Sequence, residues 1–291
     1  MPYPYQIFDV FADTALAGNP LAVVFEADAL DERQMLAIAA EFNLSETVFF
    51  LRPDSPDANA RIRIFTPTAE MPFAGHPTVG SVVALGLAHG GAAREVRLSL
   101  QAGPVTAAFT PVGSGGVAAF DAPLVPRVLE PLDTAAVAAA LGIAVRDIGF
   151  SGLAPVDATS GPTFAIIPLA DPSTLAHLER DRSVWRKAFP TPPHAAFCVA
   201  PAGDGNYRAR MFAPFAGIEE DPATGSAAVA FAALLAPGMA GDGEADFTVT
   251  QGVEMGRRSV LSLTMTRAQG NLARVRLAGQ AVKIAEGTLL L

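Results

Sequence analysis

The sequence has one cysteine, Cys198, in a chain of 291 residues. A single thiol excludes an intrachain disulfide, a cysteine-rich metal site and any mechanism that needs two thiols. Cys198 lies in the apolar, strand-like run Ala196–Ala200. This setting predicts inert packing in a core, since a reactive thiolate needs a polar and accessible environment.

Charge is also scarce, at 17% of residues, and the formal net charge is −9. The chain has no cluster of Lys and Arg, so a nucleic-acid partner is not expected. Apolar runs end well before the roughly 18 residues that a membrane span needs. The start, Met-Pro-Tyr-Pro-Tyr-Gln, lacks a basic stretch followed by an apolar one, so we expect no secretory signal, no membrane partner and a cytoplasmic protein.

What the sequence does contain is a repeat half a chain apart. The first copy runs from Arg61-Ile-Arg-Ile-Phe65-Thr-Pro67 through a loop to His76-Pro-Thr-Val-Gly-Ser81. The second runs from Arg208-Ala-Arg-Met-Phe212-Ala-Pro214 to Asp221-Pro-Ala-Thr-Gly-Ser226. Each copy reads as an alternating strand, a Pro/Gly-rich loop and an apolar buried helix. The repeat predicts two similar units that face each other across one cleft.

Each predicted buried helix begins at a residue followed by proline, because proline suits the first helical position. We therefore expect His76 and Asp221 to be equivalent N-caps. Asp is an ordinary cap residue, so Asp221 alone would indicate structure rather than chemistry. Free N–H groups and the helix dipole at both helix starts would favour an anion.

Glu46 follows Asn43-Leu-Ser45 and directly precedes the apolar strand Val48–Leu51. A Glu in a loop is usually a solvated acid. Here apolar surroundings and the hydroxyls of Ser45 and Thr47 predict a carboxylate that is held in place with a raised pKa. The second half has no obvious counterpart of Glu46, as a site with one unique acid/base would require.

The remaining pattern predicts an α+β protein of two pseudo-symmetric domains. Residues 1–120 form the first, completed by 280–291, and residues 121–279 form the second. Asp31 and Asp133 each precede a predicted helix, ending near Phe42 and Leu141. At the end of the chain we expect separate strands at Ala273–Leu277, Ala281–Ile284 and Gly287–Leu291.

These motifs together resemble the phenazine-biosynthesis PhzF-type isomerase family, whose fold is related to that of diaminopimelate epimerase. They span nearly the whole chain in the family's order: Asp9-Val-Phe11, Gly18-Asn-Pro20, Ser45-Glu-Thr47, Arg63, Thr66-Pro67, Gly75-His-Pro-Thr78, Glu220-Asp-Pro-Ala-Thr-Gly-Ser226, Gln251-Gly252 and Gly256-Arg257.

The resemblance implies two domains, each a barrel-like sheet around a central helix, and a homodimer. It implies proton transfer in a small carboxylate of the dihydro-hydroxyanthranilate type without cofactor or metal. Glu46 would move the proton, with His76 and Asp221 as catalytic partners. The residues implied to contact substrate are Ser45, Gly75, Thr224, Gly225 and Ser226.

Two other interpretations stay open. Glu46, His76 and Asp221 could be ligands of a metal-dependent lyase or hydrolase, although no His-x-His or His-Glu-x-x-His spacing is present. The chain could also be a non-catalytic protein that binds a small ligand in the same fold. Arg257 or Arg258 could reach a carboxylate, but an arginine on the surface is commoner.

Overall fold

The computed structural model describes residues 2–291 and divides the chain into two compact units. Unit 1 comprises Met1–Pro123 with Ala278–Leu291, and unit 2 comprises Leu124–Leu277. The predicted boundaries were 120/121 and 279/280. Both units mix strands with few helices, so the protein is α+β.

The elements of unit 1 are β1 (Pro2–Val10), β2 (Asn19–Val24), a 3-10 turn (Ala27–Ala29), α1 (Glu32–Phe42), β3 (Glu46–Leu51), β4 (Ala60–Phe65), β5 (Glu70–Met71), α2 (Gly75–Ala88), β6 (Arg94–Leu100), β7 (Gly103–Val112) and β8 (Gly115–Asp121).

Unit 2 contains β9 (Arg127–Pro131), α3 (Thr134–Leu141), β10 (Val156–Thr159), β11 (Thr163–Pro168), α4 (Pro172–Leu175), α5 (Arg182–Ala188), β12 (Ala196–Gly203), β13 (Asn206–Ala213), β14 (Ile218–Asp221), α6 (Gly225–Leu235), β15 (Gly243–Gln251) and β16 (Ser259–Ala268). It also has 3-10 turns at Val145–Asp147, Pro214–Ala216 and Ala236–Gly238, and β17 (Asn271–Leu290) begins in it.

The same strand pairing occurs in both units. In unit 1, β2 pairs in parallel with β3, and β3 pairs antiparallel with β4. In unit 2, β11 pairs in parallel with β12, and β12 pairs antiparallel with β13. The predicted repeat of strands is therefore confirmed, including the equivalence of β12 with β3.

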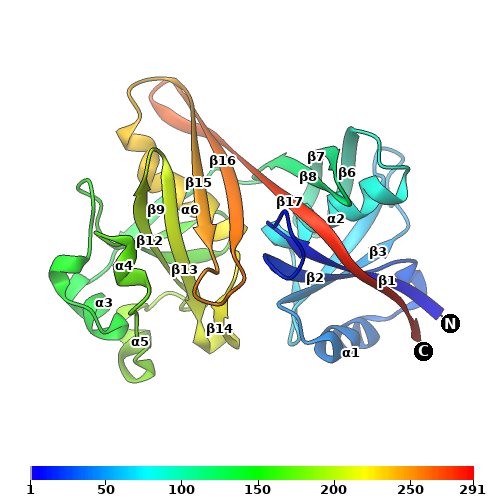
Figure 1. Ribbon diagram of the computed structural model, residues 1–291, viewed down its shortest axis with the longest axis horizontal. Coiled ribbons are helices and arrows are strands. Elements are labelled where there is room, and N and C mark those ends of the chain that lie inside the picture. Colours follow the sequence, from blue (N-terminus) through cyan, green and yellow to red (C-terminus); the bar gives the residue numbers. More distant parts are fainter. Residues whose placement is uncertain (1) are drawn as a thin grey trace. The chain divides into compact units, whose positions relative to one another are not determined.

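Each unit is built around one apolar helix. Strands of unit 1 surround α2, and strands of unit 2 pack on α6 (Figure 1). Twelve of the fourteen residues of α2 are buried, and α6 is buried at eight of its eleven positions. Helices without a polar face are stable only inside a protein, so the sequence correctly predicted their burial.

The predicted helix starts at Asp31 and Asp133 are confirmed. Asp31 accepts a hydrogen bond from the N–H of Gln34, and Oε1 of Gln34 accepts one from the N–H of Asp31. Asp133 accepts from the N–H of Ala135 at 2.9 Å. Such caps satisfy N–H groups that the first turn of a helix leaves without partners.

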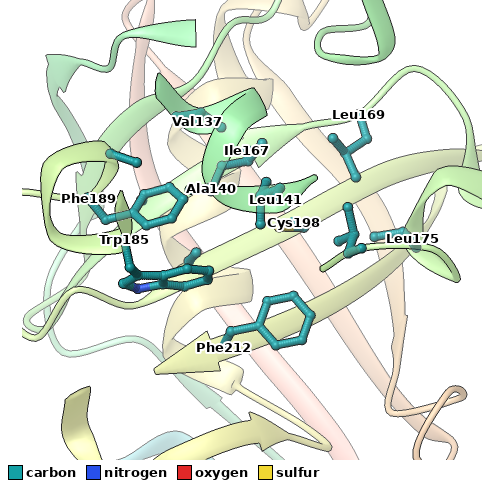
Figure 2. Close-up of a cluster of buried hydrophobic side chains, with 14 of the residues drawn as sticks. Val137, Ala140, Leu141, Ile167, Leu169, Leu175, Trp185, Phe189, Cys198 and Phe212 are labelled. Carbon is teal, nitrogen blue, oxygen red and sulfur yellow. The ribbon is translucent and has the colours of Figure 1, made fainter. Parts of the chain in front are cut away.

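The core of unit 2 surrounds Trp185 and Cys198 (Figure 2). The Trp185 ring packs edge-on to Phe189, with ring centroids 4.6 Å apart, and its Nε1–H donates to the carbonyl of His194. Cys198 is fully buried in this cluster, and burial raises the pKa of its thiol. The prediction that Cys198 packs in the core is confirmed.

The end of the chain differs from the prediction. Instead of separate strands, β17 is one strand of 20 residues from Asn271 to Leu290. Its second half pairs with β1 from Ala281↔Val10 to Leu290↔Pro2. Within this strand, Gly279 and Gly287 lie where a Cβ would come within 2.2 Å of Phe11 and 2.7 Å of Tyr5. These glycines make room for aromatic rings, and the strand continues through them.

Candidate active site

Glu46, His76 and Asn19 lie together at one end of unit 1. Glu46 is the first residue of β3 and stands beside Leu21 of β2 in the parallel ladder. Asn19 is the first residue of β2, and His76 lies in the first turn of α2. The Oε2 atom of Glu46 is 3.4 Å from Nδ1 of His76, and Nδ2 of Asn19 lies 3.4 Å from the same nitrogen.

This group is shielded from solvent. The side chain of Glu46 is 12% exposed, that of His76 is 5% exposed, and Asn19 is fully buried. Burial lowers the pKa of His76 to about 3, because the cationic ring would lose its hydration. His76 is therefore neutral near pH 7, and its contact with Glu46 is not an ion pair there.

The helix starts correct the predicted caps. α2 begins at Gly75 after Ala74, so His76 is the second helical residue and Pro77 the third. α6 begins at Gly225 after Thr224, and Asp221 is the last residue of β14. The prediction that His76 and Asp221 are equivalent caps is wrong. When the helices are aligned on their first residues, Gly75 matches Gly225, and His76 matches Ser226.

Within residues 2–291, neither buried helix receives a hydrogen bond from a capping side chain. Ala74 has no polar side-chain atom, and the hydroxyl of Thr224 is turned to the carboxylate of Asp221 at 2.5 Å. The first N–H groups of both helices and the positive ends of their dipoles are thus left for another acceptor. An anion is the ligand that such helix starts favour.

Asp221 belongs to a hydrogen-bond network in unit 2. Nε2 of Gln251 donates to the carbonyl of Asp221 at 2.7 Å and to Oγ1 of Thr224 at 3.1 Å. Oε1 of Gln251 accepts from the N–H of Thr224 at 3.1 Å. Gln251 therefore holds both ends of the 221–224 loop, and the Thr224 hydroxyl, which accepts from Gln251, donates to Asp221.

Gly252 continues this support. It has φ +73, and a Cβ at this position would meet the carbonyl oxygens of Arg257 at 2.4 Å and Pro222 at 2.7 Å. Only glycine fits so close to two backbone segments with this φ. The sequence contained the Gln251-Gly252 motif, but nothing in its spacing indicated which loop it holds. In the same segment, the Arg257 side chain is half-buried and that of Arg258 is exposed.

The other residues implied to bind substrate lie beside these two groups. Ser45 is half-buried immediately before β3, and Gly75 is buried as the first residue of α2. Thr224 and Gly225 are buried at the start of α6, and Ser226 is half-buried there. In addition, the hydroxyl of Ser160 donates to the carbonyl of Ser226 at 2.8 Å.

The strand ladders show what replaces Glu46 in unit 2. Thr47 pairs with Phe65, and Ala196 pairs with Phe212, the matching phenylalanine of the repeat. The residue before Ala196 is Ala195, so a buried alanine takes the place of Glu46. The carboxylate is thus present in one unit only.

Within residues 2–291, no three side chains among His, Cys, Asp and Glu gather closely enough to hold a metal ion. No helix in that range is both long and apolar enough to cross a membrane.

The protein has the diaminopimelate epimerase-like class of fold. This class has two similar units, and in each unit a sheet folds around one buried helix, here without a capping side chain. Comparison with known proteins narrows this class. The family model described as "Phenazine biosynthesis-like protein" matches residues 8–287. An uncharacterized isomerase of Mesorhizobium japonicum is 42% identical, over 99% of this chain and 98% of its own.

A further relative is the trans-2,3-dihydro-3-hydroxyanthranilate isomerase of Pseudomonas chlororaphis, which is 39% identical over 99% of both chains. Among solved structures, a PhzF-family phenazine biosynthesis protein of Bacillus anthracis superposes with a TM-score of 0.87. It covers 100% of both chains at 24% identity, a likeness that concerns the fold. The chain belongs to the phenazine biosynthesis-like protein family, and it is a PhzF-like isomerase.

Proposed function

We propose that this isomerase moves a proton within a small cyclic carboxylate related to trans-2,3-dihydro-3-hydroxyanthranilate, without a cofactor. The relative from Pseudomonas chlororaphis is named for that substrate and shares 39% of its residues with this chain. The observation that carries the proposal is the largely buried Glu46 carboxylate in contact with a neutral His76 at 3.4 Å.

In this reaction Glu46 takes a proton from a carbon of the substrate. The C–H bond breaks, its electron pair stays on the substrate as an enolate, and an O–H bond forms on Glu46. Glu46, whose carboxyl proton exchanges with the solvent, then delivers a proton to another atom of the substrate, and the carboxylate is restored. A general base of this kind contributes about 10²–10⁴-fold to a rate.

The enolate and the substrate carboxylate both need positive potential. The uncapped starts of α2 and α6 would supply it, with N–H groups at Gly75, Gly225 and Ser226 as donors. His76 lies within that first turn of α2. On this proposal Asp221 takes part in proton transfer, held by Thr224 and Gln251.

The test is solvent-deuterium incorporation into trans-2,3-dihydro-3-hydroxyanthranilate in D2O, followed by mass spectrometry. Glu46→Gln should abolish incorporation and leave substrate binding largely intact, because the amide keeps the shape but cannot take a proton. Glu41→Gln is the matched control, since Glu41 is an exposed acid on the nearby helix α1. Full incorporation with Glu46→Gln would overturn the role given to Glu46.

We also infer from the resemblance that the protein is a cytoplasmic homodimer. Sedimentation at several concentrations tests the assembly, and a mass of one chain throughout would contradict it.

A further inference from the structure

Three of the four histidines place Nδ1 against a backbone carbonyl. The acceptor distances are 2.8 Å from His89 to Leu85, 3.0 Å from His177 to Ser173 and 2.7 Å from His194 to Phe189. A carbonyl oxygen can only accept, so each of these Nδ1 atoms must carry a proton. His76 is different, because its Nδ1 faces the side-chain amide nitrogen of Asn19, which can only donate.

His76 has one ring proton to place. Because burial keeps this ring neutral, the proton lies either on Nδ1 or on Nε2. Two neighbours of Nδ1, each at 3.4 Å, favour different tautomers. Asn19 donates to Nδ1 and favours a proton on Nε2, whereas Glu46 is an acceptor and favours a proton on Nδ1. The Asn19 contact has the geometry of a hydrogen bond.

We infer that Asn19 is a positioning residue that holds Nδ1 of His76 as an acceptor and so places the ring proton on Nε2. Nε2 is buried, and it has no hydrogen-bond partner within residues 2–291. As an N–H it would donate to an anionic oxygen, such as that of a carboxylate or enolate. The identity of that acceptor rests on the proposed function, whereas the position of the proton does not.

The second unit supports this role for the turn that contains Asn19. Asn19 is the first residue of β2, directly after the β1–β2 connection, and Ser160 lies in the matching β10–β11 connection. The hydroxyl of Ser160 donates a hydrogen bond to the carbonyl of Ser226, the residue that matches His76 at the start of the buried helix. In both units a polar side chain at this position therefore contacts the second residue of the buried helix. In unit 2 the contact is to a backbone carbonyl, and in unit 1 it is to the imidazole ring of His76.

The direct test is a long-range ¹H–¹⁵N correlation spectrum of protein labelled with ¹⁵N-histidine, recorded near pH 8. Protonated and unprotonated ring nitrogens have distinct ¹⁵N shifts, so each tautomer can be read. We expect Nε2–H for His76 and Nδ1–H for the other three histidines. A wild-type His76 with Nδ1–H would overturn the inference without any variant.

Two substitutions reverse the effect of Asn19. Asn19→Asp replaces the donor by an acceptor, and Asn19→Leu removes the polar group and leaves Glu46 as the neighbour of Nδ1. Both should convert His76 to Nδ1–H, while unchanged signals of the other three histidines show that the fold is intact. Ser160→Ala, which removes the matching bond in unit 2, is the control and should leave His76 as Nε2–H.

The deuterium assay separates this inference from the proposed function. Asn19→Leu should lower the rate of incorporation by roughly 100-fold, as expected when a proton donor is wrongly oriented. If the tautomer changes in Asn19→Leu but Glu46→Gln still incorporates deuterium, the proposed function fails and the assignment of Asn19 stands. If His76 keeps Nε2–H in folded Asn19→Leu and Asn19→Asp, the assignment of Asn19 fails.

Discussion

At the scale of single residues, the burial of His76 links the chemistry of the site to the stability of the protein. Its pKa is about 3 in the folded protein and near 6.5 in an unfolded chain. Between these values the unfolded state binds more protons than the folded state. The free energy of unfolding therefore falls as the pH falls through this range, by up to about 1.4 kcal/mol per pH unit from this group.

His76→Gln should remove that contribution. We expect the variant to lose less stability than the wild type when the pH is lowered from 6 to 4, because glutamine does not titrate. Urea unfolding at a series of pH values measures the difference. His89→Gln changes an exposed imidazole at the end of the same helix and serves as the control. Parallel curves for the wild type and His76→Gln would contradict a buried neutral ring.

At the same scale, the sequence indicated roles for Glu46 and His76, whereas Asn19 and Gln251 stood out only as parts of motifs. A Glu at the start of a buried strand and a His at the start of an apolar helix are unusual enough to be noticed alone. Asn19 follows a glycine in a turn, where asparagine is common, and Gln251 ends an alternating strand. Their roles depend on partners 57 and 27–30 residues away, which local patterns do not reveal.

At the scale of elements, the position of α2 depends on a glycine one turn after His76. A Cβ at Gly80 would come within 2.4 Å of Leu21 Cδ2 and 2.9 Å of Val10 Cγ2. Leu21 is the strand neighbour of Glu46, and Val10 is that of Asn19. Because Gly80 has no side chain, α2 can lie close to Leu21 and Val10, the strand neighbours of the two residues that contact His76.

Gly80→Ala should therefore impair the site more than it impairs the fold. Overpacking costs about 1–3 kcal/mol, partly offset by the better helix propensity of alanine. We expect slower deuterium incorporation at a modest loss of thermal stability, and recovery when Leu21→Val removes the clashing Cδ2 atom.

Gly86→Ala is the matched control on the same helix. Its Cβ would meet the Phe109 ring at 2.5 Å. Because Gly86 lies far along α2 from His76, we expect the protein to lose stability while the folded fraction stays active. Equal losses of activity in the two variants would show that Gly80 matters only for packing.

The starts of these helices also show why sequence alone misplaced the caps. His-Pro and Asp-Pro both look like a cap followed by proline at the first helical position. In the structure each helix starts at the glycine of Ala74-Gly75 or Thr224-Gly225, and the proline falls within the first turn in one copy and before the helix in the other. Proline is tolerated at both places, so its position could not fix the register.

At the scale of the whole molecule, the two units share an arrangement of side chains that the repeated motif did not show. Arg63 forms a double hydrogen bond with Glu70, with both distances 2.6 Å, and its guanidinium lies over Phe65 at 5.0 Å. Arg210 does the same with Glu220 at 2.8 Å and Phe212 at 4.9 Å. The pairs were not visible in sequence because their members are seven residues apart in one unit and ten in the other.

The two copies differ in how far they are buried, and this difference predicts unequal costs for the same substitution. The side chains of Arg210 and Glu220 are 9% and 11% exposed, whereas those of Arg63 and Glu70 are 25% and 21% exposed. Arg63 also has Glu32 as a second acidic partner at 3.0 Å. Removing one charge of a buried pair costs about 3–5 kcal/mol, and breaking a more exposed pair costs about 1 kcal/mol or less.

Glu220→Gln should therefore destabilise the protein by several times as much as Glu70→Gln. The chain has a single tryptophan, Trp185, whose ring lies 6.4 Å from that of Phe212 and so reports on the second copy. Urea unfolding followed by its fluorescence gives the effect of Glu220→Gln, and circular dichroism gives both effects on one scale. Equal losses would mean that exposure does not set the energy of these pairs. A larger loss for Glu70→Gln would mean that the Glu32 contact does not compensate in the first unit.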